Sequence, residues 1–137
     1  QIIDYTWGRE HTFFDGPQVE HIDFSWPYCE ALRTQLLQAA SATGVNAVDG
    51  GTYGATQGPR LESAAEISRM EQDGCDIVGM TGMPEAGLAR ELELCYACCA
   101  VSANWAAGKS EGEITMEEIT ENLKSGMAQV KEIINAL

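Results

Sequence analysis

Three short polar segments carry the residue types in this chain that could do chemistry. They are residues 56–62, residues 80–85 and Asn104, and each lies where a predicted strand gives way to a predicted helix. At the first junction, the carboxylate of Glu62 could accept a ring N–H from a heterocycle. At the second, the hydroxyl of Thr81 precedes a helix N-terminus, where free backbone N–H groups attract anions. Because such junctions carry the ligand chemistry of α/β proteins, the three segments predict a small-molecule site.

Each of these residues also has a purely structural interpretation. Glu62 could cap its own helix while Arg60 pairs with a neighbouring acid. Thr81 and Gly82 could serve only the conformation of their turn, and Asn104 could be a simple turn-forming residue. The pattern alone leaves both interpretations open.

The cysteines and histidines do not predict a metal site. The five cysteines, an odd number, are Cys29, Cys75, Cys95, Cys98 and Cys99, and we interpret them as reduced thiols in the core. Cys95 and Cys98 fall in one predicted strand, where residues at this spacing do not converge on a metal, and no second such pair exists. His11 and His21 lie far away in the sequence and are interpreted as surface or turn residues.

The charge balance and the apolar content exclude two large classes of partner. The 137 residues include 8 basic and 21 acidic ones, for a net charge of −13, whereas nucleic-acid binding needs clustered Lys and Arg. No apolar run approaches the roughly 20 residues of a membrane span, and the start has no pattern of a secretion signal. With 45% apolar residues, the chain can form one domain with a real core. We therefore expect a cytoplasmic protein without nucleic-acid or membrane partners.

Strand and helix patterns alternate along the chain. Strands are predicted over residues 1–6, 45–57, 75–80 and 95–103, and helices over residues 28–43, 62–73, 84–93 and from residue 115 onward. The stretch 95–103 is nearly all apolar, which predicts a central parallel strand covered on both faces. The order βαβαβαβα predicts an α/β fold.

Local signals support the helix boundaries. Gly44 is expected to end the first helix, and Pro84 suits the first turn of the third. Thr115 and Glu118 predict a capping box at the start of the last helix. The loop at 7–28 is long for a compact domain, which favours a functional role for it.

Several stretches, spread nearly from end to end, match one known family. They are residues 1–6, 21–25, 57–62, 79–85 and 88–91, together with Asn104 and residues 106–109. In these stretches the chain resembles the carboxyl-terminal half of a trimeric purine nucleoside phosphorylase, in particular the methylthioadenosine and methylthioinosine branch of that family. The resemblance implies a mixed β-sheet flanked by helices, with residues 1–137 as a single partial domain. It also implies phosphorolysis, in which inorganic phosphate attacks the anomeric carbon of a purine nucleoside, with no cofactor.

The resemblance assigns roles to four residues. Glu62 and Asn104 hold the purine base, Met80 lines the ribose, and Thr81 contacts phosphate. Asn104 has the catalytic role, because its amide can donate to O6 of the base and accept the N7 proton as negative charge develops on the leaving purine. Glu62 can accept the N1–H of the base.

Two positions bear on the substrate. Members of the family with this Glu62 and Asn104 pair favour 6-oxopurines, whereas adenine-preferring relatives have Ser and Asp, and each buried mismatch should cost roughly 1–3 kcal/mol. Met116 stands where inosine-cleaving relatives have a His for the 5′-hydroxyl, and its thioether suits a methylthio group. The resemblance therefore implies that S-methyl-5′-thioinosine and phosphate give hypoxanthine and 5-methylthioribose 1-phosphate.

The match is incomplete in one respect. Members carry upstream sheet strands, a glycine-rich phosphate loop and an Arg-His element, none of which occurs in these residues, so we expect the chain alone to be inactive. The family is trimeric, and its long loop lends an aromatic residue to the neighbouring subunit's pocket, for which Phe14 is the nearest match. Phe13 and Phe14 could instead serve packing alone.

Other functions stay open at this point. A non-catalytic purine-binding or nucleoside-binding module would keep Glu62 and Asn104 without phosphate chemistry. A phosphorylase that prefers methylthioadenosine or inosine is another alternative. A third is an acidic α/β interaction domain with no ligand, which predicts that neither hypoxanthine nor phosphate raises the melting temperature.

Overall fold

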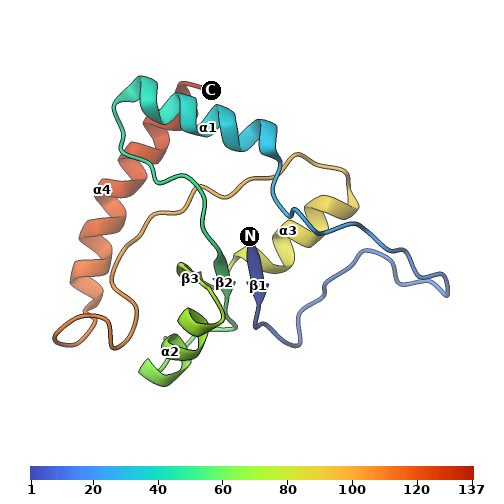
Figure 1. Ribbon diagram of the computed structural model, residues 1–137, viewed down its shortest axis with the longest axis horizontal. Coiled ribbons are helices and arrows are strands. Elements are labelled where there is room, and N and C mark those ends of the chain that lie inside the picture. The colour runs from blue at the N-terminus through green and yellow to red at the C-terminus, as the bar shows by residue number, and fades with distance from the viewer.

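A sheet of three short parallel strands lies at the centre of the computed structural model, which describes residues 1–137 (Figure 1). The strands are β1 (Ile2–Asp4), β2 (Tyr53–Ala55) and β3 (Ile77–Gly79), in the spatial order β1-β2-β3. In the register of the sheet, Asp4 lies beside Ala55 and Ala55 beside Gly79. The segments that follow the three strands therefore all begin at the same end of the sheet, where the carboxyl ends of the strands lie.

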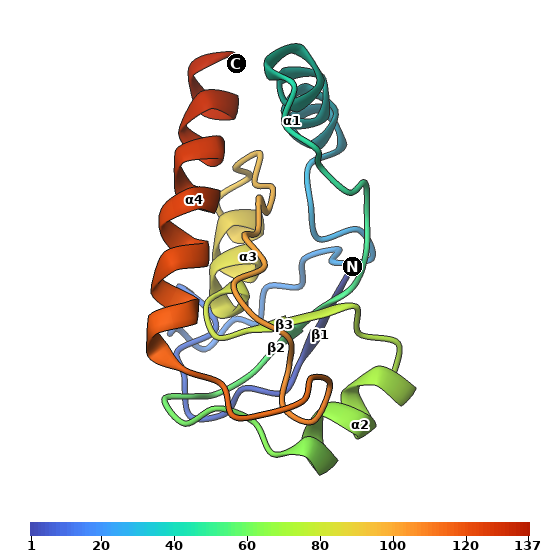
Figure 2. The same cartoon turned by 90° about the vertical axis from the view of Figure 1, so that its left-hand side faces the viewer.

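Four helices surround this sheet. They are α1 (Glu30–Thr43), α2 (Ala64–Gln72), α3 (Gly82–Glu91) and α4 (Met116–Asn135). Both views place α2 beyond the carboxyl ends of the strands and α1 on the opposite side (Figures 1 and 2). None of the four helices is long and apolar enough to cross a lipid bilayer.

The helix ends follow the local signals in the sequence. Gly44 ends α1 in the left-handed region at φ 74°, and its N–H donates to Ser41 and Ala40. The side chain of Thr115 accepts a hydrogen bond from the backbone N–H of Glu118 at the start of α4, but the return bond from the Glu118 side chain is not formed, so the predicted capping box is only half present. These predicted boundaries are confirmed because capping depends on residues close in sequence.

The one cluster of buried apolar side chains joins α1 to α4. Ala39 and Ala40 of α1 and Ile133 of α4 are buried, and Leu36 and Val45 pack against them. Figure 2 shows the carboxyl-terminal end of α4 beside α1. Only 14 of the 137 residues are buried, and the buried apolar residues outside this cluster lie in β2, α2 and α3.

The strand predicted over residues 95–103 is wrong. This stretch is irregular, and its one backbone hydrogen bond runs from the N–H of Cys29 to the carbonyl of Tyr96, at 2.7 Å. Val101 packs against Gly126 of α4, while Cys98 is exposed. An apolar run indicates burial, but a strand also needs a hydrogen-bonded neighbour, and β1, β2 and β3 do not pair with this stretch.

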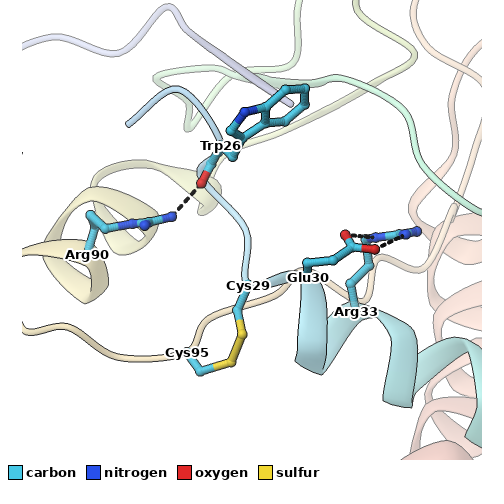
Figure 3. The surroundings of a disulfide bond; sticks show 6 residues. All are labelled: Trp26, Cys29, Glu30, Arg33, Arg90 and Cys95. Carbon is cyan, nitrogen blue, oxygen red and sulfur yellow. Dashed lines mark hydrogen bonds and ion pairs between the residues drawn. A yellow bond between two sulfur atoms is a disulfide. The ribbon is translucent and has the colours of Figure 1, made fainter. Parts of the chain in front are cut away.

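The interpretation of the cysteines as reduced core thiols is also wrong. Cys29 and Cys95 form a disulfide across a Cα–Cα distance of 5.1 Å, within the usual range for such a bond (Figure 3). The hydrogen bond from Cys29 to Tyr96 brings the two chain segments side by side. Cys98 and Cys99 are exposed rather than buried. Sequence spacing does not predict which cysteines pair, because pairing is decided by contacts between distant segments.

Candidate functional site

The carboxylate of Glu62 lies at the edge where the parallel strands end. Directly after β2, the N–H of Thr56 donates to the carbonyl of Gly79 at 2.8 Å, which continues the pairing with β3. Thr56 is buried, and its hydroxyl donates to Oε1 of Glu62 at 2.7 Å. A side chain fixed at the end of the sheet therefore holds the Glu62 carboxylate in place.

The capping alternative for Glu62 does not hold. Ser63 is the N-cap of α2, and it forms a capping box with Glu66 in which each side chain bonds the other residue's backbone N–H. The sequence signal for this box is the Ser-x-x-Glu spacing, which the sequence analysis missed. Glu62 is thus not used to cap the helix.

The expected pairing of Arg60 with an acid is present. Both terminal nitrogens of Arg60 donate to the two carboxylate oxygens of Glu66, each at 2.8 Å. These bonds, followed by the backbone N–H of Ser63, lower the pKa of Glu66 to about 2. Arg60 therefore bonds the carboxylate of Glu66, and the carboxylate of Glu62 is bonded by Thr56 instead.

A cavity of about 190 Å³ lies beside this carboxylate. Its lining includes Tyr5, Trp7, Thr56, Glu62 and Met70. Desolvation raises the pKa of the Tyr5 hydroxyl, and so does its hydrogen bond to Asp73, so Tyr5 stays a neutral donor there. The cavity combines aromatic surface with a carboxylate acceptor, as expected for a site that holds a flat heterocycle.

Met80 lies next to the loop that leads to Glu62. A Cβ atom on Gly58 would come within 2.4 Å of Sδ of Met80, and Gly58 has a left-handed φ of 64°. The thioether therefore packs against the backbone of this loop. The structure thus brings Met80 and the 56–62 segment together, and the role of Met80 at the ribose stays a prediction.

Thr81 occupies the junction between β3 and α3. Its backbone N–H donates to the Tyr53 hydroxyl at 3.4 Å, and its side chain is exposed and does not cap α3. The ring of Tyr53 lies against Gly79 and Gly82, since a Cβ on either residue would come within 2.8 Å of a ring or hydroxyl atom. Both glycines are thus required by packing, while the Thr81 hydroxyl is left available to a ligand.

Arg9 is a site residue that the sequence analysis missed. Its guanidinium reaches from the loop after β1 to four backbone carbonyls, those of Thr56, Gln57, Met80 and Met83. Carbonyl acceptors are present at every position of a chain, so no residue pattern reveals such partners in advance. The guanidinium links the loop that leads to Glu62 with the junction that holds Thr81.

Asn104 is not joined to Glu62 in this chain. Its Nδ2 donates to the carbonyl of Trp105 at 2.8 Å, and it does not line the 190 Å³ cavity. The segment that follows it does reach α2, where a Cβ on Gly108 would come within 2.7 Å of Ala64. The structure therefore places the Asn104 segment beside the helix that begins just after Glu62, without a contact between the two side chains.

Phe14 and Met116 lie outside this cavity. Phe14 lines a second cavity of about 810 Å³, formed by the long loop, the end of α3 and the disulfide segment. Met116 is the first residue of α4 and is 65% exposed. Met80 and Thr81 do not line the 190 Å³ cavity either, but they follow β3 at the same end of the sheet as Thr56 and Glu62. Phe14 and Met116 do not lie at the carboxyl ends of the strands.

Comparisons with known proteins agree with one another. The family model described as the phosphorylase superfamily matches residues 1–137. The chain is 62% identical over 132 residues to a probable S-methyl-5′-thioinosine phosphorylase of Pseudomonas syringae pv. tomato, a match that covers 95% of this chain and 54% of that protein. It is 44% identical over 143 residues to the 6-oxopurine nucleoside phosphorylase of Pyrococcus furiosus, covering 99% of this chain and 54% of that protein.

A solved structure shares the fold. The methylthioadenosine phosphorylase from Schistosoma mansoni in complex with adenine superposes with a TM-score of 0.92 at 31% identity, covering 99% of this chain and 55% of that one. The expected α/β architecture of a phosphorylase half, flanked by helices, is thus confirmed. The chain spans about half the length of the curated relatives that it matches.

Proposed function

Because the chain belongs to the phosphorylase superfamily, we propose that it serves the phosphorolysis of a purine nucleoside, as a pentosyltransferase. The proposed substrates are S-methyl-5′-thioinosine and inorganic phosphate, and the products are hypoxanthine and 5-methylthioribose 1-phosphate. The observation that carries the proposal is the Glu62 carboxylate, held by the Thr56 hydroxyl at the strand edge that also bears Met80 and Thr81. The names of the relatives in Pseudomonas syringae and Pyrococcus furiosus support it.

The proposed mechanism follows the movement of charge. Phosphate attacks the anomeric carbon, the bond from that carbon to N9 breaks with its electron pair going to the purine, and positive charge develops on the sugar in between. In this proposal Thr81 donates its hydroxyl to phosphate, and Met80 packs against the ribose. Groups that contact the developing charges accelerate the reaction, because they bind the transition state better than the ground state.

The base is held in the proposal by Glu62 and Asn104. One oxygen of Glu62 accepts from Thr56, so the other is available to accept N1–H of a 6-oxopurine. Asn104 would turn its amide from Trp105 toward the base, where it donates to O6 and accepts a hydrogen bond from N7–H of the leaving purine. Such a side-chain rotation breaks one exposed hydrogen bond and forms two to the base.

The assembly and the compartment are part of the same proposal. We infer a homotrimer in the cytoplasm, in which Phe14 of one subunit reaches the pocket of its neighbour and Met116 faces the 5′-methylthio group. The position of Phe14 away from the Glu62 cavity of its own chain supports a role across an interface. No cofactor enters the scheme, since phosphate itself is the nucleophile.

A second candidate is phosphorolysis of methylthioadenosine. It is favoured by the solved structures that the chain resembles, whose descriptions name methylthioadenosine phosphorylase with adenine bound. Against it stands the Glu62 carboxylate, because adenine offers no proton at N1 for an acceptor to bind. The hydrogen-bonding pattern of the base therefore favours the 6-oxopurine.

The deciding experiment compares three nucleosides with the full-length protein. We expect S-methyl-5′-thioinosine to be cleaved with the highest kcat/KM, ahead of methylthioadenosine and inosine, and only when phosphate is present. A preference for methylthioadenosine would select the second candidate. Binding of hypoxanthine without phosphate-dependent turnover would instead identify a non-catalytic purine-binding module.

A further inference from the structure

The guanidinium of Arg9 connects the ends of two strands that carry the proposed site. Its Nη2 donates to the carbonyls of Thr56 at 3.1 Å and Gln57 at 2.9 Å, directly after β2. Its Nη1 donates to the carbonyl of Met80 at 2.8 Å and to that of Met83, on either side of the junction between β3 and α3. Each terminal nitrogen thus serves one strand end.

The partners of Arg9 are unusual for an arginine. It is partly buried, and none of the ion pairs in the chain involves it, although the chain has 21 acidic residues. Arg33 and Arg60, by contrast, both bond to carboxylates. Arg9 therefore donates hydrogen bonds from its planar guanidinium to neutral carbonyls, and it does not form an ion pair with a carboxylate.

These carbonyls lie next to the groups that would contact the substrate. Thr56 makes both contacts: its carbonyl accepts a hydrogen bond from Arg9, and its hydroxyl donates one to Glu62. The peptide between Met80 and Thr81 is held from both sides, by Arg9 at its carbonyl and by the Tyr53 hydroxyl at its N–H. A shift of either strand end would thus move the proposed base acceptor relative to the proposed phosphate contact.

We infer that Arg9 is a positioning residue, which fixes the distance between the Glu62 carboxylate and the Thr81 hydroxyl through four backbone carbonyls. The inference rests on the proposed function. Phosphorolysis needs the base and the phosphate on opposite sides of the sugar at a set separation, and small misplacements of such groups are costly. Arg9 acts through the backbone and touches no substrate.

The inference makes the shape of the side chain matter more than its charge. A lysine keeps the positive charge, but its single ammonium on a flexible stem does not span four carbonyls arranged around a planar fork. A methionine of similar length removes both the charge and the donors. Comparing Arg9→Lys with Arg9→Met therefore separates geometry from electrostatic attraction of phosphate.

The test measures phosphorolysis of S-methyl-5′-thioinosine by the full-length protein and its variants. For both Arg9→Lys and Arg9→Met we expect kcat/KM to fall by about tenfold or more, for nucleoside and phosphate alike. Hydrogen–deuterium exchange at the amides of residues 56–58 and 80–84 should be faster in both variants. Matched controls are Arg33→Lys and Arg33→Met, since Arg33 lies on α1 and pairs with Glu30 and Asp49.

The other outcomes either overturn the inference about Arg9 or show that the proposed function fails while the inference can still be tested. Wild-type kinetics in Arg9→Lys with a loss only in Arg9→Met would show that the charge suffices and positioning is not the role. Wild-type kinetics in both variants would overturn it as well. If the wild-type protein has no phosphorolytic activity, the proposed function fails, and the exchange measurement alone decides: unchanged exchange at the two segments overturns the inference, and faster exchange supports it.

Discussion

The hydroxyl of Thr56 donates a 2.7 Å hydrogen bond to Oε1 of Glu62, and this bond links the end of a strand to the carboxylate that faces the proposed base site. Thr56 is 5% exposed, whereas Glu62 is only partly buried. The bond uses one of the two oxygens of the carboxylate. Thr56 therefore orients Glu62 while leaving it an acceptor for a ligand.

Replacing Thr56 by valine should weaken substrate binding. Thr56→Val keeps the shape but removes the donor, so Glu62 loses its orientation at a cost of about 1–2 kcal/mol, or roughly tenfold in the KM for the nucleoside. Steady-state kinetics with the full-length protein measure this change. Thr56→Ser is the control and should stay close to the wild type, and an unaltered KM in Thr56→Val would remove Thr56 from the site.

Exchanging Asn104 for aspartate should lower turnover of 6-oxopurine nucleosides. A carboxylate cannot donate to O6 of a 6-oxopurine, whereas it can accept from the N6 amino group of adenine, so kcat/KM for S-methyl-5′-thioinosine should fall by about tenfold or more. The measurement is phosphorolysis of S-methyl-5′-thioinosine and methylthioadenosine by Asn104→Asp. Loss with both nucleosides alike would point to a structural role, and kinetics identical to the wild type would exclude Asn104 from the reaction.

Removing the disulfide should destabilise the fold. The bond closes a loop between residues 66 apart in sequence, for which chain-entropy arguments give up to about 4 kcal/mol of stability. Cys29→Ser and Cys95→Ser should each lower the free energy of unfolding in urea, and a reducing agent should lower that of the wild type equally. Cys99→Ser is the matched control, because Cys99 is exposed and unpaired. Insensitivity of the wild type to reduction would show that the bond is absent in solution.

The stability of the start of α2 should depend on pH through Glu66. The bonds from Arg60, followed by that from Ser63, lower the pKa of Glu66 in the folded chain from 4.5 to about 2. A lowered pKa means that the carboxylate stabilises the fold fully above pH 4.5 and that this contribution is lost as the pH falls toward 2.

Glu66→Gln tests this dependence. Its free energy of unfolding should lie below that of the wild type by a constant amount at neutral pH, and the two curves should converge as the pH falls through that window. Because the Glu66 side chain is 40% exposed and its partner Arg60 71% exposed, the difference should also shrink in high salt. Parallel curves down to pH 2 would contradict the assignment of the shifted group to Glu66.

The sequence predicted most reliably what depends on neighbouring residues. The cap at Thr115, the end of α1 at Gly44 and the alternation of strands and helices as far as α3 all follow from local propensity and periodicity. The extended backbone of Met83 at φ −126° leaves Pro84 to begin the regular turns of α3, as its position in the sequence suggested.

The features that sequence reasoning missed depend on distant contacts. The 95–103 stretch has the composition of a buried strand, but its neighbours are α4 and the start of α1 rather than another strand. The disulfide and the four acceptors of Arg9 likewise join segments that lie dozens of residues apart. Composition reports what a segment prefers, and it does not report which other segment the chain brings beside it.

The ring of Tyr53 fills the space that side chains at Gly79 and Gly82 would otherwise occupy. The three positions consequently share one volume, although they come from β2, β3 and α3. An alanine at either glycine would be accommodated only alongside a smaller residue in place of the tyrosine. In relatives of this chain, a larger residue at Gly79 or Gly82 should therefore occur together with a smaller residue at Tyr53. A protein designer who changes one of these three positions must change the others as well.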